Sequence, residues 1–171
     1  MNNQEVIDIY DENKQKTGRT LIRHKEFLKE GEYIIGVQAI IMNSKHEILI
    51  SLRSPLKEKY PSTWECNGGG LLHNEDVVEG LIREIDEELG IKLKKEDAIY
   101  LKTAKSSYKF KEEYLFKVDI DIKDIKFKDN EAVDAKWVTI DEFMDMFHKG
   151  EIADNVDFDE DDYKRCLELL K

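Results

Sequence analysis

Residues 69–91 read GGLLHNEDVVEGLIREIDEELGI, and this glycine-rich segment with the helix pattern behind it decides the fold. Its apolar residues recur at spacings of three and four, as on the buried face of a helix: Val77, Val78, Leu81, Ile82, Ile85 and Leu89. Asn74 can cap the first turn, and Gly90 stands where helices often end in a left-handed residue. We therefore predict a helix over residues 75–89, entered from a tight loop.

Three glutamates of this predicted helix share one face, because Glu84, Glu87 and Glu88 are related by i, i+3 and i+4. Clustered carboxylates repel one another unless a cation lies between them, and Mg²⁺ and Mn²⁺ bind carboxylates together with phosphate oxygens. Arg83 can bind a neighbouring carboxylate through two N–H groups and fix its orientation. A glutamate-rich helix face is more often simply solvated. Here the preceding glycines, residues 68–70, let the backbone approach a ligand closely, which favours a binding site.

The same stretch resembles a complete Nudix box, the signature G-x5-E-x7-R-E-U-x-E-E-x-G-U, in which U is a bulky aliphatic residue. Every specified position is filled within residues 69–91. The resemblance implies an α/β fold, namely an α/β/α sandwich with a mixed β-sheet, in which the box forms a catalytic loop-helix-loop. It also implies Mg²⁺- or Mn²⁺-dependent hydrolysis of a small-molecule diphosphate, in which a nucleoside diphosphate is linked to another moiety, X. A homodimer is expected from the resemblance alone.

The resemblance also assigns roles within the box. The implied metal ligands are Gly69, Glu84, Glu87 and Glu88. These glutamates and Arg83 would be catalytic, with Arg83 orienting a carboxylate and Glu75 forming a structural salt bridge with it. Gly69 and Gly70 would also contact the substrate.

The resemblance continues on both sides of the box. Upstream, two strand patterns lead into Arg53-Ser54-Pro55 and then into residues 60–65 (YPSTWE), and Arg53 is a candidate substrate-binding residue. Downstream, residues 131–138 (EAVDAKWV) are similar to a late strand whose glutamate supplies an extra metal ligand or the general base. Glu131 is therefore a candidate catalytic residue, with an ordinary exposed acid beside Asp129 as the alternative.

The main rival function is that of an isomerase. Residues 5–19 resemble the extension of a Nudix subgroup that is related in sequence to type I isopentenyl-diphosphate isomerases. That isomerase needs a cysteine a few residues after the tryptophan of P-x-x-W, in a Cys-x-His-Pro context, and histidine ligands from the preceding strands. Here the fifth residue after Trp64 is Gly69, no His-Pro follows Cys66, and residues 33–42 contain no histidine. The pattern favours the hydrolase.

A second alternative is a non-catalytic domain that binds nucleotides as a sensor. Such domains usually show a decayed box, whereas this one is intact. Its small departures are Asn74, where glycine is common, and Gly80, where alanine is common. Asparagine tolerates a left-handed backbone. A glycine inside a helix costs about 1 kcal/mol relative to alanine, unless close packing requires it.

The composition limits the expected partners. The chain has 171 residues and a formal net charge of −11, from 38 Asp and Glu against 27 Lys and Arg. Such a chain binds nucleic acid or an anionic membrane poorly, so we expect neither partner. There is no apolar run near 18 residues and no signal-peptide pattern, and two cysteines are consistent with a reducing compartment. We therefore expect a cytoplasmic protein.

The rest of the chain predicts strands interleaved with helices, which is typical of the α/β class. Strands are predicted at residues 4–10, 33–42, 47–53, 99–105, 113–120 and 135–138. Helices are predicted at residues 23–30, 139–147 and 159–170, and Thr139 and Glu142 would form a capping box at the second of these. We predict a single domain over residues 1–171, with residues 1–32 as an N-terminal extension that packs on the core.

Overall fold

A computed structural model describes residues 5–128 and 130–171 of the chain. Its elements in chain order are β1 (Val6–Tyr10), β2 (Lys16–Ile22), β3 (Ile34–Met42), β4 (Ile48–Arg53), β5 (Trp64–Glu65), β6 (Gly68–Gly70), α1 (Val77–Leu89), η1 (Lys95–Asp97), β7 (Ile99–Lys105), β8 (Lys109–Lys117), η2 (Ile122–Asp124), β9 (Ala132–Val138), α2 (Ile140–His148) and α3 (Glu160–Leu169). The two η elements are single turns of 3₁₀-helix.

The main sheet is mixed. Its strand order is β5-β4-β3-β8-β7, with β6 also paired to β3 and β9 to β4. β3 and β8 run parallel along their whole length, from Ile34 opposite Lys109 to Met42 opposite Lys117. The other pairs in this sheet are antiparallel. The predicted α/β class with a mixed sheet is thus confirmed.

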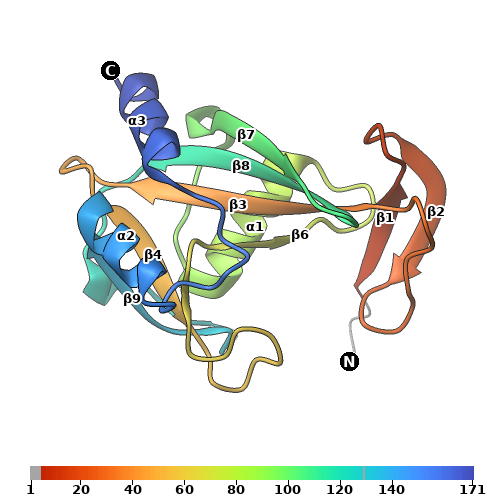
Figure 1. The fold of residues 1–171 in the computed structure, drawn as a ribbon, viewed down its shortest axis with the longest axis horizontal. Coiled ribbons are helices and arrows are strands. Elements are labelled where there is room, and N and C mark those ends of the chain that lie inside the picture. Colours follow the sequence, from red (N-terminus) through yellow and green to blue (C-terminus); the bar gives the residue numbers. More distant parts are fainter. Residues whose placement is uncertain (1–4, 129) are drawn as a thin grey trace.

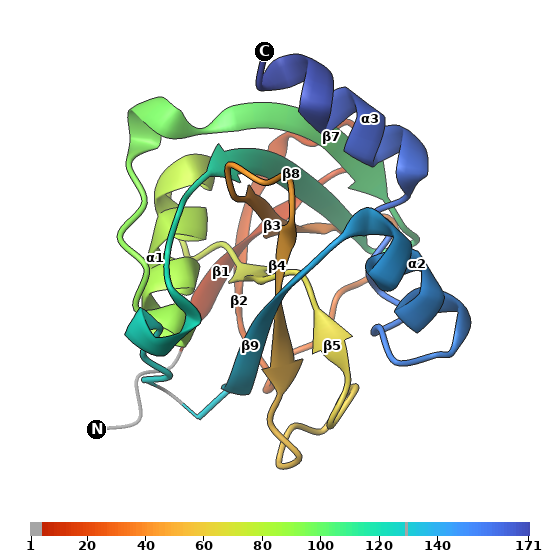
Figure 2. The same ribbon diagram turned by 90° about the vertical axis from the view of Figure 1, so that its left-hand side faces the viewer.

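Helices cover both faces of this sheet (Figure 2), with α1 on one side and α2 and α3 on the other. On the α1 side, Ile41 of β3 packs in one core cluster with Leu81 of the helix. On the other side, Ile40 packs in a second cluster with Phe143 of α2 and Cys166 of α3. β3 is almost fully buried because both of its faces are covered, which explains its continuous apolar sequence. The predicted α/β/α sandwich is confirmed.

A separate two-stranded antiparallel sheet, β1 and β2, lies beyond the start of β3 (Figure 1). Tyr10 and Tyr33 exchange two backbone hydrogen bonds of 2.8 Å, which join this hairpin to the chain just before β3. The backbone N–H of His73 donates to the carbonyl of Val6 at 2.7 Å, which joins the hairpin to the box loop. The N-terminal residues therefore contact the loop that precedes α1.

Several predicted segments differ from the structure, among them the strand predicted at residues 135–138, which begins at Ala132. The helix predicted at residues 23–30 is wrong, because this segment forms turns in which His24 has a left-handed backbone (φ 64°). Phe27 is 88% exposed and only Leu28 of this segment packs against the hairpin core, which is too little apolar burial to stabilise so short a helix. The strand predicted at residues 113–120 begins four residues earlier, at Lys109, because its pairing with β3 extends over that stretch.

The ends of the helices are largely as the local sequence predicts. Thr139 and Glu142 form the predicted capping box at α2. Gly90 ends α1 with a left-handed backbone (φ 68°), also as predicted. None of the helices in residues 5–128 and 130–171 has the length and hydropathy needed to cross a membrane.

Candidate active site

The loop before α1 differs from its prediction in one respect. The N-cap is Asp76, whose carboxylate accepts hydrogen bonds from the backbone N–H groups of Val78 and Glu79. Asn74 has a left-handed backbone (φ 60°) and lies in the loop, so the predicted N-cap and the predicted start at residue 75 are wrong. Asparagine is suited to this conformation, so the tight loop is kept where a glycine is more common.

Arg83 binds Glu75 through two hydrogen bonds, of 2.7 Å from Nε and 2.9 Å from Nη2, which confirms the predicted salt bridge. Nη2 also donates to the carbonyl of Gly70 at 3.1 Å. Burial opposes ionisation of Glu75, but the hydrogen bonds from Arg83 and from the backbone of Leu72 outweigh it and lower the pKa of Glu75. A methyl group at Gly80 would lie 2.7 Å from Oε2 of Glu75, so glycine leaves room for this carboxylate.

Glu84 lies against the glycine strand β6. Gly69 pairs with Val37 and faces α1, and a methyl group on it would overlap the Glu84 carboxylate, with Oε2 only 2.5 Å away. The Glu84 side chain is 13% exposed, and its Oε1 is 3.1 Å from Nη1 of Arg83. Burial raises the pKa of Glu84, and the nearby Arg83 partly opposes that rise. Glycine at position 69 is therefore what admits a buried carboxylate here.

The other two box glutamates occupy different depths on α1. Glu88 is buried, whereas the Glu87 side chain is 53% exposed and its Oε2 lies 3.0 Å from Nη1 of Arg83. The carboxylates of Glu84 and Glu87 thus converge on one guanidinium nitrogen. The structure brings Glu84 and Glu87 to Arg83 and places Gly69 against Glu84. The predicted convergence of Glu88 with these two glutamates on a metal stays a prediction.

These residues fit a hard divalent cation because of the ligand atoms that they offer. Glu84, Glu87 and Gly69 offer only carboxylate and carbonyl oxygens, which Mg²⁺ prefers. The space that a methyl group at Gly69 would fill holds a carboxylate instead. In residues 5–128 and 130–171, no three His, Cys, Asp or Glu side chains are grouped so that they could hold a metal ion. Arg83 binds the carboxylates of Glu84 and Glu87 in this structure. The assignment of Gly69, Glu84, Glu87 and Glu88 as metal ligands stays a prediction.

Glu131 and Arg53 are each held by other groups beside the loop that follows β4. Oε2 of Glu131 accepts a hydrogen bond from Lys57 at 2.5 Å, and its backbone carbonyl accepts one from Ser54 at 2.8 Å. Arg53 donates from Nη1 to Glu65 at 2.6 Å and also to backbone carbonyls of the same loop. The role of Glu131 as general base and that of Arg53 as a substrate contact stay predictions.

Two cations near the glycine strand were not predicted from the sequence. Lys109 lies over Gly36, where a methyl group would be 2.5 Å from its Nζ. The guanidinium of Arg23 lies 3.4 Å from where a Cβ of Gly70 would stand. No motif near either residue points to this position. The sequence predicts Lys109 in a turn between two strands and Arg23 in a helix.

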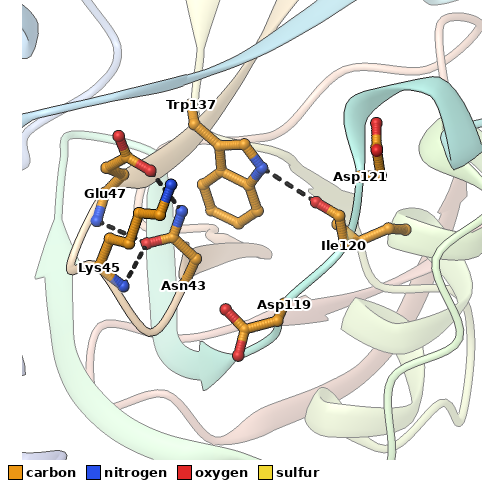
Figure 3. Close-up of a pocket in the computed structure, with 7 residues that line it drawn as sticks. All are labelled: Asn43, Lys45, Glu47, Asp119, Ile120, Asp121 and Trp137. Carbon is orange, nitrogen blue, oxygen red and sulfur yellow. Dashed lines mark hydrogen bonds between the residues drawn. The ribbon is translucent and has the colours of Figure 1, made fainter.

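A shallow pocket of about 350 Å³ lies elsewhere (Figure 3). It begins at Asn43, the residue that follows β3. It is lined by Asn43, Lys45, Glu47, Asp119, Ile120, Asp121 and Trp137. The Trp137 indole donates to the carbonyl of Ile120 at 3.1 Å, and the Asn43 amide donates to Glu47 at 2.7 Å. This pocket contains none of the predicted site residues.

The sequence pattern of the NUDIX domain matches residues 32–156. An uncharacterized Nudix hydrolase of Listeria monocytogenes is 33% identical over 152 residues, covering 86% of this chain and 87% of that protein.

Two solved structures are similar in fold. A crystal structure of a protein from Deinococcus radiodurans has a TM-score of 0.74 and 22% identity, and the match covers 98% of this chain and 100% of that one. The NUDIX domain of NrtR from Shewanella oneidensis, solved with ADP-ribose, has a TM-score of 0.56 and 14% identity, over 71% of this chain and 80% of that one. The match to the first structure includes the N-terminal hairpin.

Proposed function

Because this chain belongs to the Nudix hydrolase family, we propose that it hydrolyses the diphosphate of a nucleoside diphosphate linked to a moiety X, with Mg²⁺ or Mn²⁺ as cofactor. The observation that supports this most is the arrangement of Arg83 between the carboxylates of Glu75, Glu84 and Glu87. Glycines at positions 69 and 80 leave the space that two of these carboxylates need.

In this proposal Glu84, Glu87, Glu88 and the carbonyl of Gly69 hold the metal. Bound there, a divalent cation neutralises phosphate charge, polarises phosphorus and lowers the pKa of a water. Arg83 fixes the carboxylates in position through its hydrogen bonds, so that little reorganisation is needed when the substrate binds.

Gly69, Gly70 and Arg53 contact the substrate, and Glu131 is the proposed general base. Attack by water forms a new P–O bond at one phosphorus while the bridging P–O bond breaks. The base accepts the proton of the water, and a nucleoside monophosphate and phosphoryl-X leave.

The isomerase alternative is not favoured. Its chemistry needs a reactive cysteine, and Cys66 is buried in the core cluster beneath α2 and α3. Burial raises the pKa of the Cys66 thiol far above its usual range, with Glu113 contributing further. A buried thiol of this kind is inert rather than catalytic.

The test is a screen for Mg²⁺-dependent phosphate release from nucleoside diphosphates, sugar nucleotides, dinucleoside polyphosphates, oxidised nucleotides, ADP-ribose and isopentenyl diphosphate. We expect Glu87→Gln to lower kcat/KM by at least about 100-fold, because even the outer partners of a metal site are worth about 10- to 100-fold. The matched control is Glu79→Gln, on the same helix but paired with Lys95, which should retain activity.

Each outcome of the screen has a distinct meaning. Turnover of a nucleotide that Glu87→Gln loses and Glu79→Gln keeps would support the hydrolase and identify X. Unchanged turnover in Glu87→Gln would remove Glu87 from the mechanism. An allylic isomer from isopentenyl diphosphate would support the isomerase, and nucleotide binding without any turnover would support a sensor.

A further inference from the structure

Lys109 lies at the start of β8, and its side chain extends over the neighbouring strand β3. Its aliphatic stem and Nζ fill the space where a side chain at Gly36 would stand. The side chain is partly buried, and its Nζ has no hydrogen bond or ion pair to any residue that the structure describes. Burying an ammonium group without an anionic partner costs folding free energy, so such a lysine needs an explanation.

The surroundings of Lys109 add to this cost. Burial lowers the pKa of Lys109, and the positive charges of Lys111, Arg23 and Lys59 lower it further. The negative charge of Glu65 opposes this lowering of the pKa, but its carboxylate is already ion-paired with Arg53 at 2.6 Å. Lys111 and Arg23 are ion-paired with Asp157 and Glu5, at 2.5 and 2.8 Å, whereas Lys109 has no acidic partner among the residues that the structure describes. An ammonium group without an acidic partner attracts anions.

Arg23 lies beside Lys109 on the same face of the sheet. Gly36 and Gly70 are register partners on β3 and β6, so their missing side chains would point to the same face. Lys109 covers the first of these glycines, and the guanidinium of Arg23 covers the second at 3.4 Å. Arg23 is ion-paired with Glu5 at 2.8 Å, with side chains 36% and 46% exposed. An exposed pair of this kind is worth little, so Arg23 can exchange it for a ligand.

Lys109 and Arg23 lie on the face of the sheet that is opposite to the box glutamate Glu84. Gly69, next to Gly70 on β6, faces the opposite side and contacts Glu84. The charge of Arg23 also opposes the burial-driven rise in the pKa of Glu84, which places the two side chains within electrostatic reach. Glu84 and the guanidinium of Arg23 therefore lie on opposite faces of the same three-residue glycine strand.

We propose that Lys109 and Arg23 form a phosphate-binding subsite over Gly36 and Gly70. The ligand class is a phosphate oxyanion, and the lysine and arginine supply the N–H donors that such a group binds best. The assignment of this oxyanion to the second phosphoryl group of the substrate rests on the proposed function. The glycines serve to let these two side chains lie flat against the backbone.

Calorimetric titration of inorganic pyrophosphate in the presence of EDTA tests this subsite apart from the metal site. We expect the wild type to bind, and Lys109→Met to weaken binding by about tenfold or more, because charge-assisted hydrogen bonds to phosphate are lost. The matched control is Lys117→Met, an exposed lysine on the same strand, which should bind as the wild type does. Arg23→Gln is a second variant of the subsite, expected to bind more weakly as well.

Melting temperatures provide the check on folding. Lys109→Met should melt above the wild type in phosphate-free buffer, since it removes a buried unpaired charge. Pyrophosphate should raise the melting temperature of the wild type but not that of Lys109→Met.

The results separate this proposal from the proposed function. Glu87→Gln should bind pyrophosphate in EDTA like the wild type, even though its hydrolytic activity is lost. If no substrate is turned over but Lys109→Met and Arg23→Gln lose binding, the subsite stands and the hydrolase proposal fails. The subsite is refuted if the wild type does not bind pyrophosphate, or if both variants bind it as tightly as the wild type.

Discussion

At the scale of single residues, Arg83 organises the site. Its guanidinium contacts three carboxylates and one backbone carbonyl, those of Glu75, Glu84, Glu87 and Gly70. A planar group with donors on two edges can hold several acceptors in one plane, which an ammonium on a flexible stem cannot do. The positions of the carboxylates therefore depend on arginine rather than on positive charge alone.

The Arg83→Lys variant tests that dependence. We expect kcat/KM to fall by about 10- to 100-fold and the free energy of unfolding to fall by about 1 to 3 kcal/mol, because the two hydrogen bonds to Glu75 cannot both be kept. Steady-state kinetics and urea unfolding measure the two effects. Arg165→Lys, at an exposed position on α3, is the control. Full activity in Arg83→Lys would show that charge alone is sufficient.

At the scale of elements, the start of α1 is set by its cap. The sequence predicts Asn74 as the cap, whereas the structure has Asp76, two residues further on, in that position. The backbone of Asn74 is left-handed, which is incompatible with the extended conformation of an N-cap, whereas Asp76 is extended and accepts two backbone hydrogen bonds. Glu75, between them, is thereby left free of the helix and binds Arg83.

If Asp76 is the cap and Asn74 is not, substitutions of the two residues should differ in their effect on the free energy of unfolding. Asp76→Ala should lower the free energy of unfolding by about 0.5 to 2 kcal/mol, since two N–H groups at the helix start lose their acceptor. Asn74→Gly should change it by only a few tenths, because glycine adopts the same left-handed backbone. Urea unfolding of both variants gives the comparison. An equal cost for the two would mean that Asp76 does not stabilise the start of α1 as its cap.

At the scale of the whole molecule, Asp8 links the N-terminal hairpin to the box loop. Its carboxylate accepts a hydrogen bond from the backbone of Asn74 at 2.9 Å, shares one of 2.8 Å with the His73 ring, and pairs with Lys16 at 2.8 Å. Burial opposes ionisation, but the hydrogen bonds from Lys16, Asn74 and His73 outweigh it and lower the pKa of Asp8 from 3.8 to about 2. We propose that this link makes residues 5–32 part of the same folding unit as the core.

This link predicts a dependence of stability on pH. A carboxyl group whose pKa is lower in the folded state stabilises the protein above its unfolded pKa, and this stabilisation is lost as the pH falls through the folded value. We therefore expect the free energy of unfolding to fall more steeply in the wild type than in Asp8→Asn between pH 3.8 and about 2. Asp97→Asn, at an exposed position, should follow the wild type. Equal slopes in the wild type and Asp8→Asn would contradict the role of Asp8.

The sequence by itself determined the features that depend on spacing along the chain. The order of residues 69–91 sets the helix, its left-handed end at Gly90 and the pairing of Arg83 with Glu75, because these contacts join residues a few turns apart. It also identified the family and the fold class. The predicted cytoplasmic location and homodimer stay predictions.

Only the tertiary structure decided which distant residues meet at the glycine strand. Lys109 lies over Gly36 because β8 pairs in parallel with β3, and Arg23 reaches Gly70 because the N-terminal hairpin docks on the box loop. Strand register and the docking of a hairpin are fixed by burial over the whole fold, and local periodicity does not contain them. The box glutamates could therefore be predicted from the sequence, whereas the cations on the other side of the same strand could not.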